Sequence, residues 1–152
     1  MNRPEILTAT TRIAAAPAEV FPYLIDPSLI VEWIGNWAEL KPEPGGVFAL
    51  DVHGTEVRGS YLSVEPPDRV VFTWGARGSE VLPPGSTTVE IRLTADGDET
   101  IVELRHYDLP VKQRAPHEAG WASYLEILRY TAASVDAKGA PAPAVIPCRR
   151  PD

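Results

Sequence analysis

The feature that most constrains the fold is an alternating stretch, TTVEIRLTADGDETIVELRHYDL, at residues 87–109. Apolar and polar residues alternate on both sides of Asp96-Gly97, a dipeptide typical of tight β-turns. The pattern predicts a β-hairpin with one buried face. The residues expected on that face are Val89, Ile91 and Leu93 in the first strand and Val102, Leu104 and His106 in the second.

Shorter segments elsewhere have the same period of two. They are bounded by Gly, Pro and Asp clusters, which are typical of turns. We expect strands at residues 6–14, 37–40, 47–52, 56–64 and 69–74. In the last of these, Val70, Phe72 and Trp74 share one face, followed by the loop GARGSEVLPPGS.

Helical periodicity occurs at both ends of this β-rich region. Pro17 suits the first turn of a helix running to Ile25, which Asp26-Pro27 should end. Asp26 or Ser28 can cap a second short helix reaching Ile34. A long helix is expected from Pro116 to a stop at Lys138-Gly139, with an apolar face of Trp121, Tyr124, Leu125, Leu128, Ala132 and Val135.

This order predicts an α+β helix-grip fold, in which a curved antiparallel sheet of six to seven strands wraps around the final helix. Two short helices follow the first strand. Such a sheet tends to leave a hollow against the helix. We expect a single domain at residues 1–137 and a proline-rich, flexible tail at 138–152.

Composition excludes several classes of partner. The formal net charge of −7, without a basic patch, argues against nucleic acid. No apolar run approaches the length of a membrane span or a signal peptide. Cys148, the single cysteine, cannot form an intrachain disulfide, and we expect a cytoplasmic protein.

Several segments together resemble a known family. They are APAEVFPYLIDPSLIVEWIG, KPEPGGVFAL, RGSYLSVEPPDRVVFTW, TTVEIRLT, TIVELRHYDLP and HEAGWASYLEILRYTA. Their order and spacing are similar to bacterial members of the family named after the activator of the heat-shock-protein-90 ATPase. That family lies within the START and birch-pollen-allergen-like (SRPBCC) superfamily. Ile34 departs from the pattern, because these proteins often carry a second tryptophan there.

The resemblance implies a cavity between the curved sheet and the final helix, without implying a reaction. Each aromatic or apolar side chain of the expected inner face either fills the core or lines this cavity. The candidate lining residues are Trp33, Trp37, Phe48, Leu50, Tyr61, Phe72, Trp74, Ile91, Leu104, His106, Trp121, Tyr124, Leu125 and Leu128. Trp74 adjoins a long loop, which favours a mouth at that end.

His106 is the weak candidate for a catalytic residue. An inward histidine is either a structural hydrogen-bonding group or a ligand-orienting group or general base. His117 and Glu118 do not form the zinc signature HExxH, because Trp121 occupies the second histidine position. We interpret Gly120 as allowing close approach of the helix to the sheet, and we expect no metal and no cofactor.

The function that these patterns favour is binding of an apolar, aromatic or lipid-like small molecule in the cavity. One alternative is a cyclase, dehydratase or hydrolase that uses the same cavity, and another is a co-chaperone-like interaction domain. As partners we expect a small hydrophobic ligand, neither nucleic acid nor a membrane span. A homodimer and a chaperone partner stay open.

Overall fold

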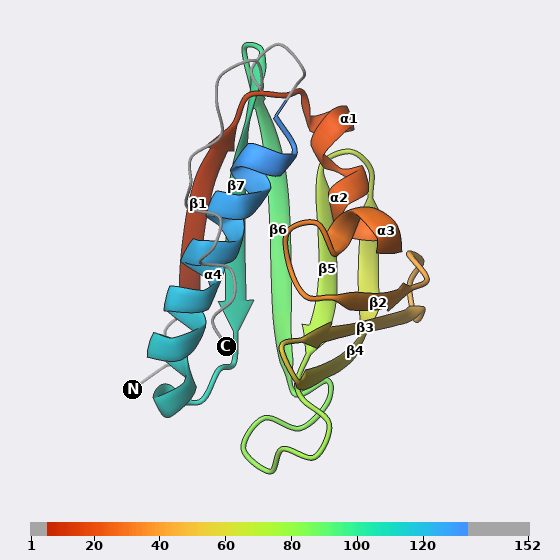
Figure 1. Cartoon of the computed structure of the whole chain (residues 1–152), viewed down its shortest axis with the longest axis vertical. Helices are drawn as coiled ribbons and strands as arrows, with labels where there is room; N and C mark the ends of the chain where they lie inside the picture. Colours follow the sequence, from red (N-terminus) through yellow and green to blue (C-terminus); the bar gives the residue numbers. More distant parts are fainter. Residues whose placement is uncertain (1–5, 134–152) are drawn as a thin grey trace.

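The computed structural model describes residues 6–133. The strands hydrogen-bond into one seven-stranded antiparallel sheet with the order β1-β7-β6-β5-β4-β3-β2 (Figure 1). Their bounds are β1 Leu7–Ile13, β2 Trp37–Leu40, β3 Val47–Val52, β4 Thr55–Glu65, β5 Arg69–Trp74, β6 Thr87–Asp96 and β7 Glu99–Tyr107. The helix-grip architecture predicted from the sequence is confirmed.

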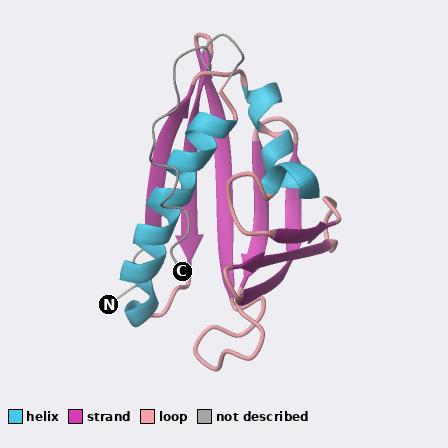
Figure 2. Cartoon of the chain, viewed as in Figure 1, coloured by secondary structure: helices cyan, strands magenta, loops and turns pink. Residues whose placement is uncertain are grey.

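The predicted hairpin forms two adjacent strands of this sheet, between β1 and β5. β6 and β7 pair from Thr88–Tyr107 to Asp96–Glu99, so the turn consists of Gly97 and Asp98, one residue later than the predicted Asp96-Gly97. β1, the first strand of the chain, pairs with β7, and Leu7 lies opposite His106. All helices lie on one face of the sheet (Figure 2).

The short helices follow β1, with two differences from the prediction. The expected helix over residues 17–25 is divided into α1 Pro17–Val20 and α2 Pro22–Ile25, because Pro22 lacks the N–H needed to continue the first one. The side chain of Asp26 accepts from the Ser28 N–H and caps α3, as predicted. This helix, Pro27–Ile30, ends earlier than Ile34, and a turn carries the chain to β2.

The long helix α4 spans Val111–Thr131 and lies along β1 on the concave side of the sheet (Figure 1). It begins five residues before the predicted start at Pro116, which stands inside the helix. The hydrogen bond lost there would have used the carbonyl of Lys112, an exposed residue that water can reach.

The C-terminal end of α4 also differs from the prediction. The helix stops at Thr131, whose hydroxyl donates to the Ile127 carbonyl and so competes with the helical backbone bonding. Val135, the predicted stop at Lys138-Gly139 and the tail with Cys148 lie outside the described residues.

Aromatic side chains fill the middle of the core. The rings of Phe48 and Phe72 stack with centroids 3.9 Å apart, and Tyr61 meets Phe48 edge-on at 5.5 Å. The buried Tyr61 hydroxyl donates to the Leu24 carbonyl at 3.0 Å, and burial raises the pKa of this phenol. The sheet and the short helices are therefore tightly joined here, which limits any open space to the ends of the layer.

Candidate functional site

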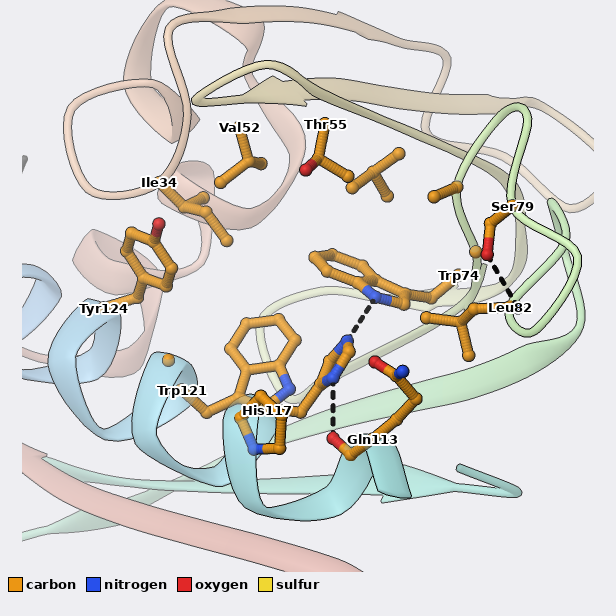
Figure 3. Close-up of a pocket in the computed structure, with 15 residues that line it drawn as sticks. Ile34, Val52, Thr55, Trp74, Ser79, Leu82, Gln113, His117, Trp121 and Tyr124 are labelled. Carbon is orange, nitrogen blue, oxygen red and sulfur yellow. Dashed lines mark hydrogen bonds between the residues drawn. The ribbon is translucent and has the colours of Figure 1, made fainter. Parts of the chain in front are cut away.

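A pocket of about 320 Å³ opens at the end of the sheet where α4 begins (Figure 3). We call it the end pocket. The α4 residues that line it are Gln113, Pro116, His117, Gly120, Trp121 and Tyr124. The opposite wall comprises Ile34, Val52, Thr55, Val57, Trp74, Gly75, Ala76, Ser79 and Leu82.

The loop between β5 and β6 forms one side of this pocket. Backbone hydrogen bonds attach it to β4: the Arg58 N–H donates to the Gly75 carbonyl, and the Arg77 N–H donates to the Glu56 carbonyl, both at 2.9 Å. Within the loop, the Ala76 N–H donates to the Leu82 carbonyl at 2.7 Å. The loop is thus held in place by main-chain contacts, with Leu82 buried against the pocket.

The walls of the end pocket are mainly apolar and carry no formal charge. None of the described residues that line it is Asp, Glu, Lys or Arg. The polar side chains present are Thr55, Ser79, Gln113, His117 and Tyr124. Such a lining suits an uncharged guest, because an ion would lose its hydration without gaining a counter-charge.

His117 stands at the base of the end pocket between Gln113 and Trp74 (Figure 3). Its Nδ1 is 2.9 Å from the Gln113 carbonyl oxygen, which can only accept, so Nδ1 carries the proton. Nε2 is then an acceptor, and the Trp74 indole N–H donates to it over 3.3 Å. Burial lowers the pKa of His117, which favours this neutral form.

His106 lies behind the end pocket and is fully buried. The Trp121 indole N–H donates to its Nδ1 at 3.0 Å, so Nε2 carries the proton and donates to the Thr87 hydroxyl at 2.8 Å. That hydroxyl donates in turn to the Trp74 carbonyl at 2.8 Å. Burial, with a smaller contribution from the nearby His117, lowers the pKa of His106 to about 3.

This network engages both ring nitrogens of His106. It joins the two tryptophans of the pocket wall to β6 and β7 through neutral hydrogen bonds. The arrangement corresponds to the structural alternative for His106. A general base would need a free ring nitrogen facing the pocket.

A second space lies deeper in the core and is nearly filled, with a volume of about 10 Å³. Ile34, Trp74 and Trp121 line both this inner space and the end pocket, so their side chains form the partition between the two. The hollow expected along the helix is therefore concentrated at one end, because aromatic packing closes the middle.

The structure divides the candidate cavity residues into four groups. Trp74, Trp121 and Tyr124 line the end pocket. The residues around the inner space are Trp33, Phe48, Leu50, Phe72 and Ile91, together with the shared Trp74 and Trp121. Tyr61, Leu104, His106, Leu125 and Leu128 are buried and line neither space.

Trp37 lies apart from the rest. It begins the edge strand β2, is 43% exposed, and has the Arg58 guanidinium 5.4 Å from its ring centroid. The alternating pattern did not reveal this position, because a four-residue strand carries too little periodicity to define its inner face.

Gly120 has a different role from the one expected. A Cβ atom placed on it would meet only the Tyr124 ring, at an ordinary contact distance of 3.9 Å. Close packing against the sheet therefore does not require glycine here. A helical glycine lowers helix stability by roughly 1 kcal/mol relative to alanine. What it provides is open space in the wall of the end pocket.

Most of the α4 residues of the end pocket were not among the predicted cavity residues. Gln113, His117, Gly120 and Tyr124 recur at intervals of three and four, which places them on one helical face. That spacing is the signal that could have identified them. Gln113 was missed because the predicted helix started at Pro116, whereas His117 and Gly120 lay inside that helix but were not assigned to the cavity, and Tyr124 was.

No cluster of three or more His, Cys, Asp or Glu side chains within residues 6–133 could hold a metal ion. No helix of the same region is long and apolar enough to cross a bilayer.

Comparison with known proteins gives a consistent family match. The family model described as activator of Hsp90 ATPase homolog 1-like protein matches residues 14–133. The solution structure of an AHSA1-like protein from Rhizobium etli is 41% identical, with 98% of this chain and 93% of that chain covered and a TM-score of 0.68. No match was found among curated proteins.

Two further solved structures extend the comparison. CalU16 from Micromonospora echinospora is 29% identical over 91% of this chain and 77% of that chain, with a TM-score of 0.68. The Aha1 dimer from Colwellia psychrerythraea is 16% identical over 83% of this chain and 94% of its own, with a TM-score of 0.72. At that identity the likeness concerns the fold alone.

Proposed function

The chain belongs to the family of activator of Hsp90 ATPase homolog 1-like proteins, and from this starting point we propose a binding function. The end pocket would bind a small uncharged molecule. The guest would be apolar or aromatic, held between the first half of α4 and the loop after β5. The pocket volume of about 320 Å³ lies at the lower end of the range usual for ligand sites.

The observation that carries this proposal is Gly120. Glycine in the middle of a helix is unfavourable, and no neighbouring backbone requires it at this position. Its replacement by a larger residue would fill the end pocket, whereas glycine keeps the pocket open. A binding function gives a physical reason for this cost in helix stability.

The lining favours binding over catalysis. The ionisable side chains on the described walls are His117 and Tyr124, and Nδ1 of His117 is held by the Gln113 carbonyl. Its other ring nitrogen, Nε2, which would have to serve as a base, already accepts from the Trp74 indole N–H. The uncharged, apolar wall instead provides contact area for a neutral guest.

The proposal is tested by titration with N-phenyl-1-naphthylamine, an uncharged probe whose fluorescence rises in apolar surroundings. The wild-type chain should bind it saturably. Gly120→Leu places a side chain in the end pocket and should weaken binding at least about tenfold, while the folded state is retained because leucine favours helix more than glycine.

A matched control adds the same side chain outside the pocket. Ala119 is exposed and precedes Gly120 on α4, so Ala119→Leu should leave the probe affinity unchanged. Equal binding by Gly120→Leu and wild type, or absence of saturable binding in wild type, would contradict the proposed function.

A further inference from the structure

The contact between His117 and Trp74 is an unusual polar feature in an apolar pocket wall. Nε2 of His117 is an acceptor whose only donor among the described residues is the Trp74 indole N–H, at 3.3 Å. This exceeds the usual N–H hydrogen-bond distance of about 2.9–3.0 Å, so the bond is a weak one. The Trp74 N–H and His117 Nε2 therefore face each other at the pocket base, joined only by this long hydrogen bond.

The fixed tautomer of His117 limits which ligand group can improve this contact. Because the Gln113 carbonyl holds the proton on Nδ1, a partner for Nε2 must donate a hydrogen. A partner for Trp74 Nε1 must accept one. A hydroxyl group does both through a single oxygen. To accept it between them, the Trp74 and His117 nitrogens would have to move apart from 3.3 Å to about 4.5 Å, and one long hydrogen bond would then be replaced by two of ordinary length.

Other common polar groups satisfy only one side of this pair. An ether or carbonyl oxygen can accept from Trp74 but leaves Nε2 without a donor. A carboxylate would meet no cation among the described lining residues, in a chain whose formal net charge is −7. The side chains thus discriminate among ligands by hydrogen-bond type as well as by shape.

From this geometry we propose that the end pocket recognises a hydroxyl group on its ligand, which donates to His117 Nε2 and accepts from Trp74 Nε1–H. The ligand class is then an uncharged aromatic or aliphatic alcohol. This inference rests on the proposed function, because it concerns the head group of the same guest.

The test compares three probes that share one ring system: 2-naphthol, 2-methoxynaphthalene and naphthalene. Affinities are measured by titration while NMR follows the indole N–H signals. In wild type, 2-naphthol should bind about 3- to 10-fold more tightly than 2-methoxynaphthalene, the ratio that one net hydrogen bond provides. The Trp74 indole signal should shift most with 2-naphthol.

His117→Leu should remove this preference, so that 2-naphthol binds no better than 2-methoxynaphthalene, whose own affinity stays the same. His117→Gln keeps an acceptor oxygen and should retain part of the preference. Glu118→Gln, at an exposed neighbour that does not line the pocket, should behave as wild type.

The outcomes separate this inference from the proposed function. If all three probes bind wild type equally, or if the advantage of 2-naphthol persists in His117→Leu, the hydroxyl assignment is overturned while apolar binding stands. If none of the probes binds, the proposed function fails, and the assignment of a ligand head group fails with it.

Discussion

At the scale of single residues, His106 and His117 have distinct surroundings despite ring centroids only 5.3 Å apart. His106 is enclosed by Trp121 and Thr87 and has no ring nitrogen left for a guest. His117 lines the end pocket and keeps an acceptor toward Trp74. The first is thus suited to maintaining the pocket wall and the second to contacting a ligand.

The structural role of His106 leads to a prediction about stability. His106→Leu leaves the buried Trp121 indole N–H without an acceptor, so the free energy of unfolding should fall by about 1–3 kcal/mol. Urea denaturation at neutral pH measures this change. His53→Asn, at an exposed turn residue with φ of 48°, is the control and should shift stability by less than about 0.5 kcal/mol. An equally small change for His106→Leu would contradict the role.

The same residue predicts a pH dependence. The pKa of His106 is about 3 in the folded state and 6.5 in its ordinary environment, so below about pH 6.5 the unfolded chain takes up a proton that the folded chain does not. The contribution of neutral His106 to the free energy of unfolding is therefore fully present above this pH and is lost as the pH falls. Between about pH 7 and pH 5 the loss from His106 should be about 2 kcal/mol.

Urea denaturation across this pH range provides the measurement. The lowered pKa of His117 adds a loss in the same direction, so the wild-type decrease should exceed that of His106→Leu, which keeps only the contribution of His117. The ordinary pKa values of carboxylates lie below this range and contribute little. Identical pH profiles for the two proteins would contradict the assignment.

At the scale of elements, the strands were predicted more accurately than the helix ends. The hairpin at residues 87–109 and the segments 47–52 and 69–74 follow from alternation, because one face of each is buried. The start of α4 was predicted wrongly at Pro116. A proline is tolerated inside this helix because the backbone hydrogen bond that it removes would have used the carbonyl of an exposed residue.

The candidate site could be predicted only in part. Trp74, Trp121 and Tyr124 were identified because large aromatic residues mark the inner face. Helical periodicity cannot show where along the face packing ends, so core residues such as Leu125 and Leu128 were included. The spacing could place Gly120 on the pocket face of the helix, but its role depends on the empty space beside it, which only the structure shows.

The loop after β5 provides a prediction at this scale. A Cβ atom on Gly75 would overlap the Pro83 carbonyl oxygen, so the path of the loop requires glycine at this position. Gly75→Ala should displace the loop, reduce the free energy of unfolding by about 1–3 kcal/mol and weaken binding of N-phenyl-1-naphthylamine.

Hydrogen exchange of residues 76–86 together with the probe titration checks this expectation. Glu80→Ala changes an exposed loop residue outside the pocket lining and should leave both readouts unchanged. Unaltered exchange and affinity in Gly75→Ala would show that the close approach to Pro83 does not position the pocket wall.

At the scale of the whole molecule, the space enclosed by the curved sheet and its helices is nearly filled in the middle and open at one end. The stacked Phe48 and Phe72 fill the centre, and Ile34, Trp74 and Trp121 separate it from the end pocket. The packed centre thus stabilises the fold, while the end pocket gives a ligand access to the same space between sheet and helices. This division allows an open pocket without a hollow core.

The most direct test of this account is a crystal structure of the chain with N-phenyl-1-naphthylamine bound. The probe should lie between Gly120 of α4 and the Trp74 wall, with the inner core unchanged. Occupancy of a different surface, or an end pocket closed by its own side chains in the presence of saturating probe, would contradict it.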